Sequence, residues 1–190
     1  LRAHGRPSHS GLDHAAGRSA IRVLARRILE IEAMTDYDRH VVLNVGTVSG
    51  GTGANTVPEW AEALVDLRID DPADAEAFDA RLHALAGEED EVRVTVEGGI
   101  NRPPYRKTPG IAAMHAEAEA VARDLGFALP DVHTGGGGDS SFVAATTPVL
   151  DGLGVEGGGA HTLGEWVALE SLAPRAALLA RLIGRFAAKS

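Results

Sequence analysis

The stretch that decides the fold is residues 41–69, VVLNVGTVSGGTGANTVPEWAEALVDLRI. Its first eight residues are mostly apolar, and its last nine place an apolar residue at every odd position from Ala61 to Ile69. Alternation of this kind predicts a strand with one buried face. The glycine-rich segment 49–55 between the two runs predicts a turn. The stretch therefore predicts two consecutive strands joined by a turn.

The residues before and after this stretch are each predicted to form a helix and a further strand. Residues 11–29 predict a turn leading into a helix, because apolar residues recur there at helical spacing while arginines occupy the other face. A second helix is expected from Asp71-Pro72 to about residue 86, and alternating valines predict a strand over residues 91–97. With a first strand near residues 1–6, the order is βαββαβ, the ferredoxin-like arrangement of the α/β class. We expect this lobe to span residues 1–100.

Residues 105–190 follow a proline-rich link and alternate helix with short apolar segments. Helices are predicted over about 110–125 and 172–186, the second with Ser171 as its cap. A single short strand, residues 147–150, cannot form a stable sheet alone. We therefore expect this part to be the C-terminal portion of an α/β domain whose earlier strands lie outside the sequence.

Composition limits the classes of partner. The 18 basic and 27 acidic residues give a net charge of -9, which argues against nucleic acid and against an anionic membrane surface. No apolar run reaches the roughly 18 residues of a membrane-spanning helix, and no basic segment followed by an apolar one opens the sequence. The chain has no cysteine, so a metal would need His, Asp or Glu ligands, and a cytoplasmic location is expected. Small molecules or proteins remain as partners.

His161 is the candidate metal ligand. It lies in the segment GGGAHTLGEW, residues 157–166, where glycines let the backbone turn and present an imidazole without neighbouring bulk. A catalytic zinc usually needs about three protein ligands and an open position for water. No other histidine shows the HExxH motif or another metal-ligand spacing.

Two further segments have more than one interpretation. The glycine loop, residues 135–138, opens a predicted helix and could bind an anion through its backbone N–H groups, or it is a flexible turn with Asp139 as cap. The acidic run of residues 88–91 resembles a pair of acid and base residues, but its place between a helix and a strand favours a solvated turn.

Three polar side chains are candidates for binding substrate. His9 precedes a turn and could donate a hydrogen bond to a developing oxyanion, or it is a surface histidine. Arg68 could bind a substrate carboxylate with two parallel bonds, or it pairs with Asp66 or Asp70. Asn55 is either a turn residue or an amide that binds substrate.

Six motifs in this order carry a resemblance to a known family. They are GRPSHSG with GRSAI at residues 5–11 and 17–21, VGTVSGG at 45–51, NTVP at 55–58, DLR at 66–68, the glycine loop with Asp139, and GAHT at 159–162 followed by Glu165. Together they resemble the zinc peptidase and deacylase family that includes glutamate carboxypeptidase, acetylornithine deacetylase, succinyl-diaminopimelate desuccinylase and aminoacylase. The match covers nearly the whole chain.

The resemblance implies two domains and a role for each candidate. Residues 1–100 would form the lid and dimerisation domain, and residues 105–190 the C-terminal part of the catalytic domain. His161 matches the last zinc ligand, and His9 matches a lid histidine that reaches the active site of the opposite subunit. The positions that hold the substrate carboxylate and the scissile carbonyl match Asn55, Arg68, Gly136, Gly137 and Gly138. The family's other zinc ligands and its general-base glutamate precede the lid, so the isolated chain is expected to be inactive.

The resemblance further implies a metal-dependent amidohydrolase that cleaves N-acyl amino acids or small peptides with a free carboxylate. It implies zinc, as one or two ions that cobalt or manganese could replace, and a homodimer formed through the lid. The alternative is a dimerisation or regulatory module without catalysis, since the edge of a split βαβ sheet can pair with a second copy.

Overall fold

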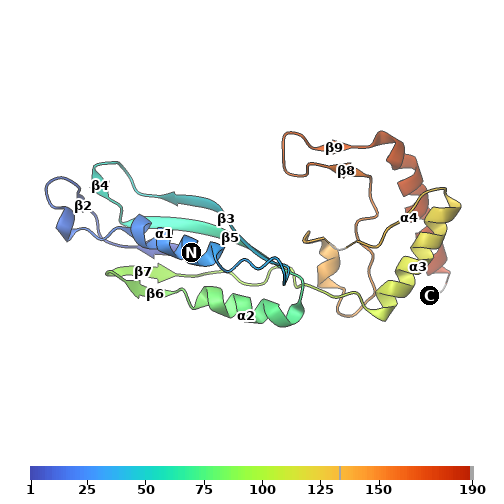
Figure 1. The fold of residues 1–190 in the computed structure, drawn as a ribbon, viewed down its shortest axis with the longest axis horizontal. Helices are drawn as coiled ribbons and strands as arrows, with labels where there is room; N and C mark the ends of the chain where they lie inside the picture. The colour runs from blue at the N-terminus through green and yellow to red at the C-terminus, as the bar shows by residue number, and fades with distance from the viewer. Residues whose placement is uncertain (133, 189–190) are drawn as a thin grey trace. The chain divides into compact units, whose positions relative to one another are not determined.

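The computed structural model describes residues 1–132 and 134–188 and divides the chain into two compact units, Leu1–Arg106 and Lys107–Ser190 (Figure 1). The prediction of a mixed α/β fold is confirmed. Within the described residues, no helix combines the length and the apolar character needed to cross a membrane.

Unit 1 is built on a five-stranded antiparallel sheet with the order β3-β5-β1-β7-β6. Four of these strands are the predicted ones, and their order is that of a ferredoxin-like sheet with one strand added at an edge. The strands are β1 (Arg2–His4), β3 (Val41–Gly50), β5 (Trp60–Ile69), β6 (Gly87–Glu89) and β7 (Val92–Thr95). Two shorter strands, β2 (Ser8–His9) and β4 (Thr56–Val57), pair separately.

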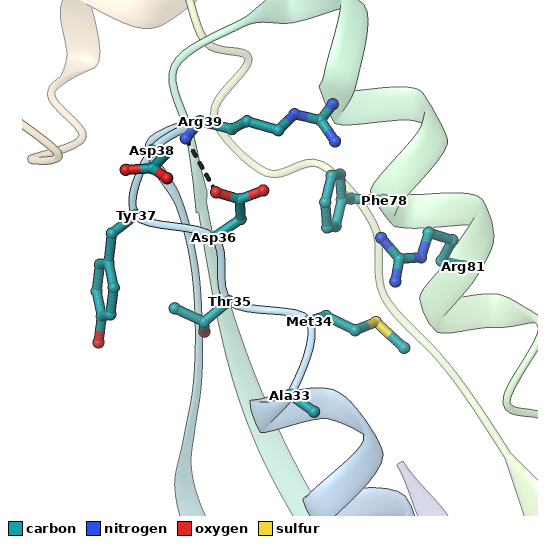
Figure 2. Close-up of a pocket in the computed structure, with 9 residues that line it drawn as sticks. All are labelled: Ala33, Met34, Thr35, Asp36, Tyr37, Asp38, Arg39, Phe78 and Arg81. Atoms are coloured by element: carbon teal, nitrogen blue, oxygen red, sulfur yellow. Dashed lines mark hydrogen bonds between the residues drawn. The ribbon is translucent and has the colours of Figure 1, made fainter.

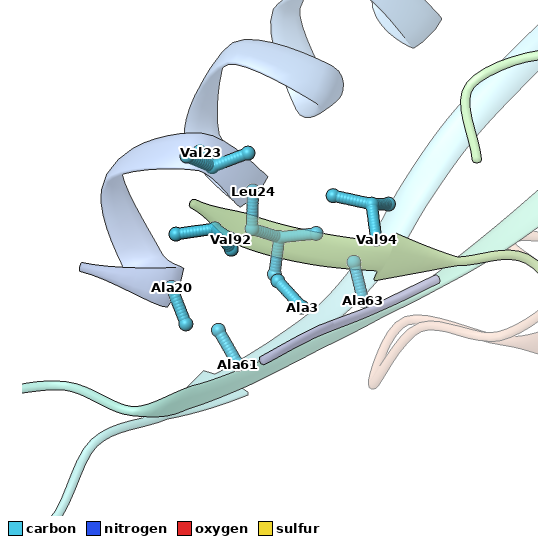
Figure 3. Close-up of a cluster of buried hydrophobic side chains, with 8 residues drawn as sticks. All are labelled: Ala3, Ala20, Val23, Leu24, Ala61, Ala63, Val92 and Val94. Carbon is cyan, nitrogen blue, oxygen red and sulfur yellow. The ribbon is translucent and has the colours of Figure 1, made fainter. Parts of the chain in front are cut away.

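Helix α1 (Ala20–Glu32) covers the sheet of unit 1. It begins where the Ser19 side chain accepts a hydrogen bond from the Arg22 backbone, and it extends three residues beyond its predicted end. Val23 and Leu24 are buried among β-strand side chains (Figure 3). Their partners in this cluster include small alanines at Ala3, Ala61 and Ala63, which let the helix approach closely.

Helix α2 (Pro72–His83) begins with Asp71 as its cap and Pro72 in its first turn, as predicted. It buries Phe78 in a second cluster with Ile31 of α1 and Leu43 of β3. The helix ends about three residues earlier than expected, because the chain turns at once into β6. The two clusters give unit 1 a continuous layer of apolar contact between helices and sheet.

The acidic run of residues 88–91 differs from the predicted turn. Its first two residues lie in β6, and the turn itself consists of Asp90 and Glu91, whose φ angles are 51° and 59°. Both carboxylates bond to arginines: Arg22 Nη2 lies 3.0 Å from Asp90 Oδ2, and Arg18 Nε lies 2.8 Å from Glu91 Oε1. The hydrogen bond from Arg18 lowers the pKa of Glu91. The turn is therefore ion-paired to the start of α1 rather than only solvated.

Unit 2 is organised by two helices, α3 (Pro109–Asp124) and α4 (Leu172–Ala187), which pack through a cluster centred on Val121, Leu178 and Leu182. Both helices lie close to their predicted bounds. The described strands of this unit are the two-residue pair β8 (Gly157–Gly158) and β9 (Trp166–Val167). Residues 147–150, predicted as a strand of a sheet whose other strands lie outside the sequence, pair with no strand in the described part of the chain.

The helix predicted after the glycine loop is also shorter than expected. It is one 3₁₀ turn, Asp139–Phe142, and the residue at its cap position is Gly138 instead of Asp139. A single 3₁₀ turn carries little of the macrodipole on which anion binding at a helix end depends. A ligand at this loop would therefore be bound by individual backbone groups of the loop and not by a helix dipole.

Candidate functional site

His9 has a defined ring orientation on the surface of unit 1. It ends β2, and its Nδ1 accepts hydrogen bonds from the backbone N–H groups of Gly11, at 3.1 Å, and Leu12, at 3.2 Å. An imidazole nitrogen that accepts hydrogen bonds carries no proton, so in the neutral ring the proton lies on Nε2. The exposed His9 side chain thus offers an N–H donor to a group outside unit 1.

The turn that holds His9 is closely packed. Gly17 lies against Ser8 and Val57, and a Cβ at Gly17 would lie 2.4 Å from Ser8 Oγ. The strand pair β2–β4 sets His9 opposite Thr56. These contacts fix the backbone from which the imidazole extends.

Asn55 lies next to His9 in space. Its backbone carbonyl accepts a hydrogen bond of 2.9 Å from Ser10 N, and it immediately precedes β4. The residue is exposed. The structure therefore brings together two of the site residues predicted from sequence, His9 and Asn55, on one surface of unit 1.

Arg68 lies elsewhere in unit 1. It is near the end of β5, eight residues after Trp60, which corresponds to about 26 Å along an extended strand. Its Nε donates to Asp66 Oδ2 at 2.7 Å, and both side chains are about half exposed. The Asp66 pairing that the sequence left open as an alternative is thus present. One copy of unit 1 does not bring Arg68 to His9.

The glycine loop of unit 2 lies against a carboxylate that the sequence did not single out. Gly136 and Gly137 are exposed, whereas Gly138 is half-buried beside Asp151. Asp151 Oδ2 accepts a hydrogen bond of 2.7 Å from Ser140 Oγ. The carboxylate beside Gly138 therefore comes from a separate segment of the chain.

His161 lies in the connection between β8 and β9 and is exposed. Its φ of 66° is in the left-handed region, which is uncommon for a residue other than glycine and is often found at functional sites. Thr162 closes this turn: its hydroxyl donates to the Gly159 carbonyl at 2.7 Å and accepts from Gly164 N at 3.1 Å. The sequence placed Thr162 in the GAHT motif but did not indicate these partners, because they are backbone groups.

The residues that the structure describes do not by themselves form a zinc site. Among residues 1–132 and 134–188, no three His, Asp or Glu side chains lie close enough together to hold a metal ion. His161 is free to supply one ligand, and about three are needed for a catalytic zinc.

One hollow in unit 1 lies apart from the predicted site residues (Figure 2). It has a volume of about 460 Å³ and is lined by residues 33–39 and by Phe78 and Arg81 of α2. The guanidinium groups of Arg39 and Arg81 lie 5.7 Å and 4.7 Å from the centre of the Phe78 ring. Arg39 also pairs with Asp74 at 2.5 Å. These contacts attach the α1–β3 connection to α2.

Comparison with known proteins agrees with the motifs. Residues 1–94 match the family model described as a peptidase dimerisation domain. Over 195 residues the chain is 27% identical to succinyl-diaminopimelate desuccinylase of Paracoccus denitrificans, with 98% of this chain and 50% of that enzyme covered. It is 33% identical over 120 residues to a protein of Arthroderma gypseum named "Probable carboxypeptidase", with 54% of this chain and 26% of that protein covered.

Solved structures share the fold. Aminopeptidase PepT from Bacillus cereus has a TM-score of 0.66 at 23% identity, covering 96% of this chain and 49% of that chain. A tripeptidase from Staphylococcus aureus has a TM-score of 0.68 at 24% identity, covering 96% and 49%. A Bacillus subtilis protein described as a dinuclear metal-binding peptidase of the M20 family has a TM-score of 0.61 at 16% identity, covering 95% and 48%.

The chain spans about half the length of the desuccinylase and of these solved structures. The family predicted from the ordered motifs is confirmed. Residues 1–94 are an M20 peptidase dimerisation domain, and along nearly its whole length the chain is similar to a succinyl-diaminopimelate desuccinylase.

Proposed function

We propose that the intact protein is a metal-dependent amidohydrolase that cleaves N-acyl amino acids or small peptides with a free carboxylate. In this proposal residues 1–100 form its lid and dimerisation domain, and residues 105–190 form the C-terminal part of its catalytic domain. Relatives named succinyl-diaminopimelate desuccinylase and the six ordered motifs support this assignment. Both point to hydrolysis of an amide bond.

The observation that carries the proposal is the pair of backbone hydrogen bonds that His9 Nδ1 accepts. Attack of water on an amide carbonyl places negative charge on the carbonyl oxygen, and a fixed N–H donor at that oxygen stabilises the transition state. His9 offers such a donor, because its Nδ1 is occupied by the backbone N–H groups of Gly11 and Leu12. We assign His9 the catalytic role of oxyanion donor.

Substrate binding is assigned to the remaining candidates. The exposed guanidinium of Arg68 would bind the substrate carboxylate while Asp66 holds its Nε. Asn55, next to His9, would contact the acyl group through its amide. The backbone N–H groups of Gly136, Gly137 and Gly138 would orient the scissile amide.

His161 is proposed as a metal ligand, with zinc as the metal, bound as one or two ions that cobalt or manganese could replace. When bound, such a metal lowers the pKa of a coordinated water and makes it a nucleophile near neutral pH. The remaining ligands and the general base would come from a part of the protein outside these 190 residues. The isolated chain would then lack activity.

Unit 2 has exposed apolar side chains, which supports the proposal that a further segment of polypeptide covers this surface. Leu163 is fully exposed, Leu169 is 72% exposed, and Trp166 and Val167 are at least half exposed. Clusters of large apolar side chains at the surface mark places that another part of a protein covers. We assign this surface to the rest of the catalytic domain.

The homodimer is proposed to form along β3. This ten-residue strand ends the sheet. Residues 32–36 bond to the first half of its outer edge, at Val41, Leu43 and Val45, and within the described residues no strand pairs with the second half, which includes Val48. Beside it runs an apolar groove of about 160 Å³ between α1 and β3, in which Ile21 and Val48 remain 43% and 57% exposed. An edge strand flanked by apolar side chains can pair with a second copy about a two-fold axis.

The dimer can be tested by light scattering on the 190-residue chain. Val48→Lys places a charge in the groove and is expected to give a monomer. Leu64→Lys, on a 60% exposed side chain of β5, is the control and is expected to leave the dimer intact. A Val48→Lys dimer as stable as the parent would contradict the assignment of β3.

The activity is tested by comparing this chain with a form that includes the upstream polypeptide. The longer form is expected to bind metal and to hydrolyse N-acyl amino acids, and His161→Ala to abolish both. His14→Ala, an exposed histidine of the same chain, is the control. A dimer that binds no metal and hydrolyses nothing in either form would favour the alternative, a non-catalytic dimerisation module.

A further inference from the structure

Asp151 lies at the centre of a small hydrogen-bond network in unit 2. Its Oδ2 accepts from Ser140 Oγ at 2.7 Å, and its Oδ1 accepts from the backbone N–H of Gly152 at 2.8 Å. Ser140 belongs to the 3₁₀ turn that follows the glycine loop. One carboxylate therefore connects two segments that are eleven residues apart.

Gly138, the last residue of the glycine loop, leaves room for this carboxylate. A Cβ at Gly138 would lie 2.1 Å from Asp151 Oδ2, a distance that two such atoms cannot adopt. The backbone of Gly138 has φ -112° and ψ 173°, an extended conformation that any residue adopts. A side chain at Gly138 would therefore displace the neighbouring carboxylate, whereas the local backbone would accept it.

We propose that Asp151 is a positioning residue for the glycine loop. It occupies the space beside Gly138 and bonds to Ser140, so the carboxylate sets where the loop ends and where the 3₁₀ turn begins. The proposal rests on the proposed function in one respect, because it assumes that residues 136–138 orient the substrate. Asp151 itself is not assigned any contact with substrate.

Two variants and their combination test the shared space in the 190-residue chain. Gly138→Ala is expected to push the carboxylate away and raise the hydrogen-exchange rate of the Gly152 amide about tenfold. The Asp151→Ala variant has no carboxylate to displace. Adding Gly138→Ala to it is therefore expected to change the hydrogen-exchange rate of the Ser141 amide by less than about threefold. Gly135→Ala is the control, because a Cβ there meets nothing within 4 Å.

Kinetics of the longer form test the positioning role. Asp151→Ala is expected to raise KM for an N-acyl amino acid about tenfold with a smaller change in kcat, because a mobile loop weakens substrate binding. Asp151→Asn keeps an oxygen for Gly152 N and a polar group for Ser140, so KM is expected to return to within about threefold of the parent.

Two results would overturn the proposal. One is a Gly138→Ala variant whose Gly152 amide exchanges as slowly as in the parent, since the side chain would then displace nothing. The other is an unchanged KM in Asp151→Ala. The exchange experiment requires no enzymatic activity. It therefore tests the position of Asp151 even if the proposed function is wrong, and the two failures can be told apart.

Discussion

Replacing His9 by asparagine separates the two roles of this side chain. The Nδ1 acceptor holds the turn at Gly11 and Leu12, while the Nε2 donor is assigned to the oxyanion. An asparagine side-chain oxygen can accept from backbone N–H groups two or three residues ahead, as in an Asx turn. His9→Asn is therefore expected to keep the turn and lose the donor, whereas His9→Ala loses both.

The magnitudes follow from these contacts. Each hydrogen bond of 3.1–3.2 Å from an exposed amide contributes about 0.5–1.5 kcal/mol to the free energy of unfolding, and water replaces much of it. We expect His9→Ala to cost about 1 kcal/mol of stability and His9→Asn less. Loss of one oxyanion donor lowers kcat by about 10²–10³, or about 2.7–4 kcal/mol of transition-state stabilisation, and this is expected for both variants.

The assay is steady-state hydrolysis of an N-acyl amino acid by the longer form, together with urea unfolding of the 190-residue chain. His14→Asn serves as the control, because His14 is exposed in the same segment and no role is assigned to its imidazole. If His9→Asn retained kcat within about threefold of the parent, the oxyanion role would be refuted. If His9→Asn destabilised the chain more than His9→Ala, the account of the turn would be wrong.

Three further predictions concern the stability of unit 1 and the turn that contains His161. Leu24→Ala should lower the free energy of unfolding by about 2–5 kcal/mol because it leaves a cavity under α1, whereas Leu29→Ala, on a 72% exposed side chain, should change it by less than about 0.5 kcal/mol in urea melts. The pKa of Glu91 is lowered from its ordinary 4.5 in the folded chain, so its ion pairs contribute stability above that pH and lose it as the pH falls through the folded pKa. The Tm should therefore fall more steeply below about pH 4.5 in the parent than in Glu91→Gln. Thr162→Val should speed hydrogen exchange of the Gly164 amide, and Thr162→Ser should not, because only the serine keeps the hydroxyl that accepts from that amide.

The sheet of unit 1 could be predicted because its signals are local. Alternating residues 61–69 bury one face of β5, and Pro72 after Asp71 marks the start of α2. The acidic run of residues 88–91 could not be interpreted in this way. Its carboxylates bond to arginines more than 60 residues away, and such pairing depends on how α1 lies against the β6–β7 turn.

Unit 2 was harder to predict, because short apolar segments do not distinguish strand from loop. Residues 147–150 have the composition of a strand, but no partner strand lies beside them in the described part of the chain. The glycine loop shows the same limit. Four consecutive glycines indicate a backbone that something approaches closely, and only the folded chain identifies Asp151 as the group beside Gly138.

The sequence by itself determined the family, the βαββαβ order and the residue types of the candidate site, since all of these depend on motifs and periodicity along the chain. The tertiary structure decided the state of each candidate. It oriented the His9 ring through two backbone N–H groups, held Arg68 with Asp66, and separated these two residues along β5. Hydrogen bonds and close packing join residues that are near in space, and distance along the chain does not reveal them.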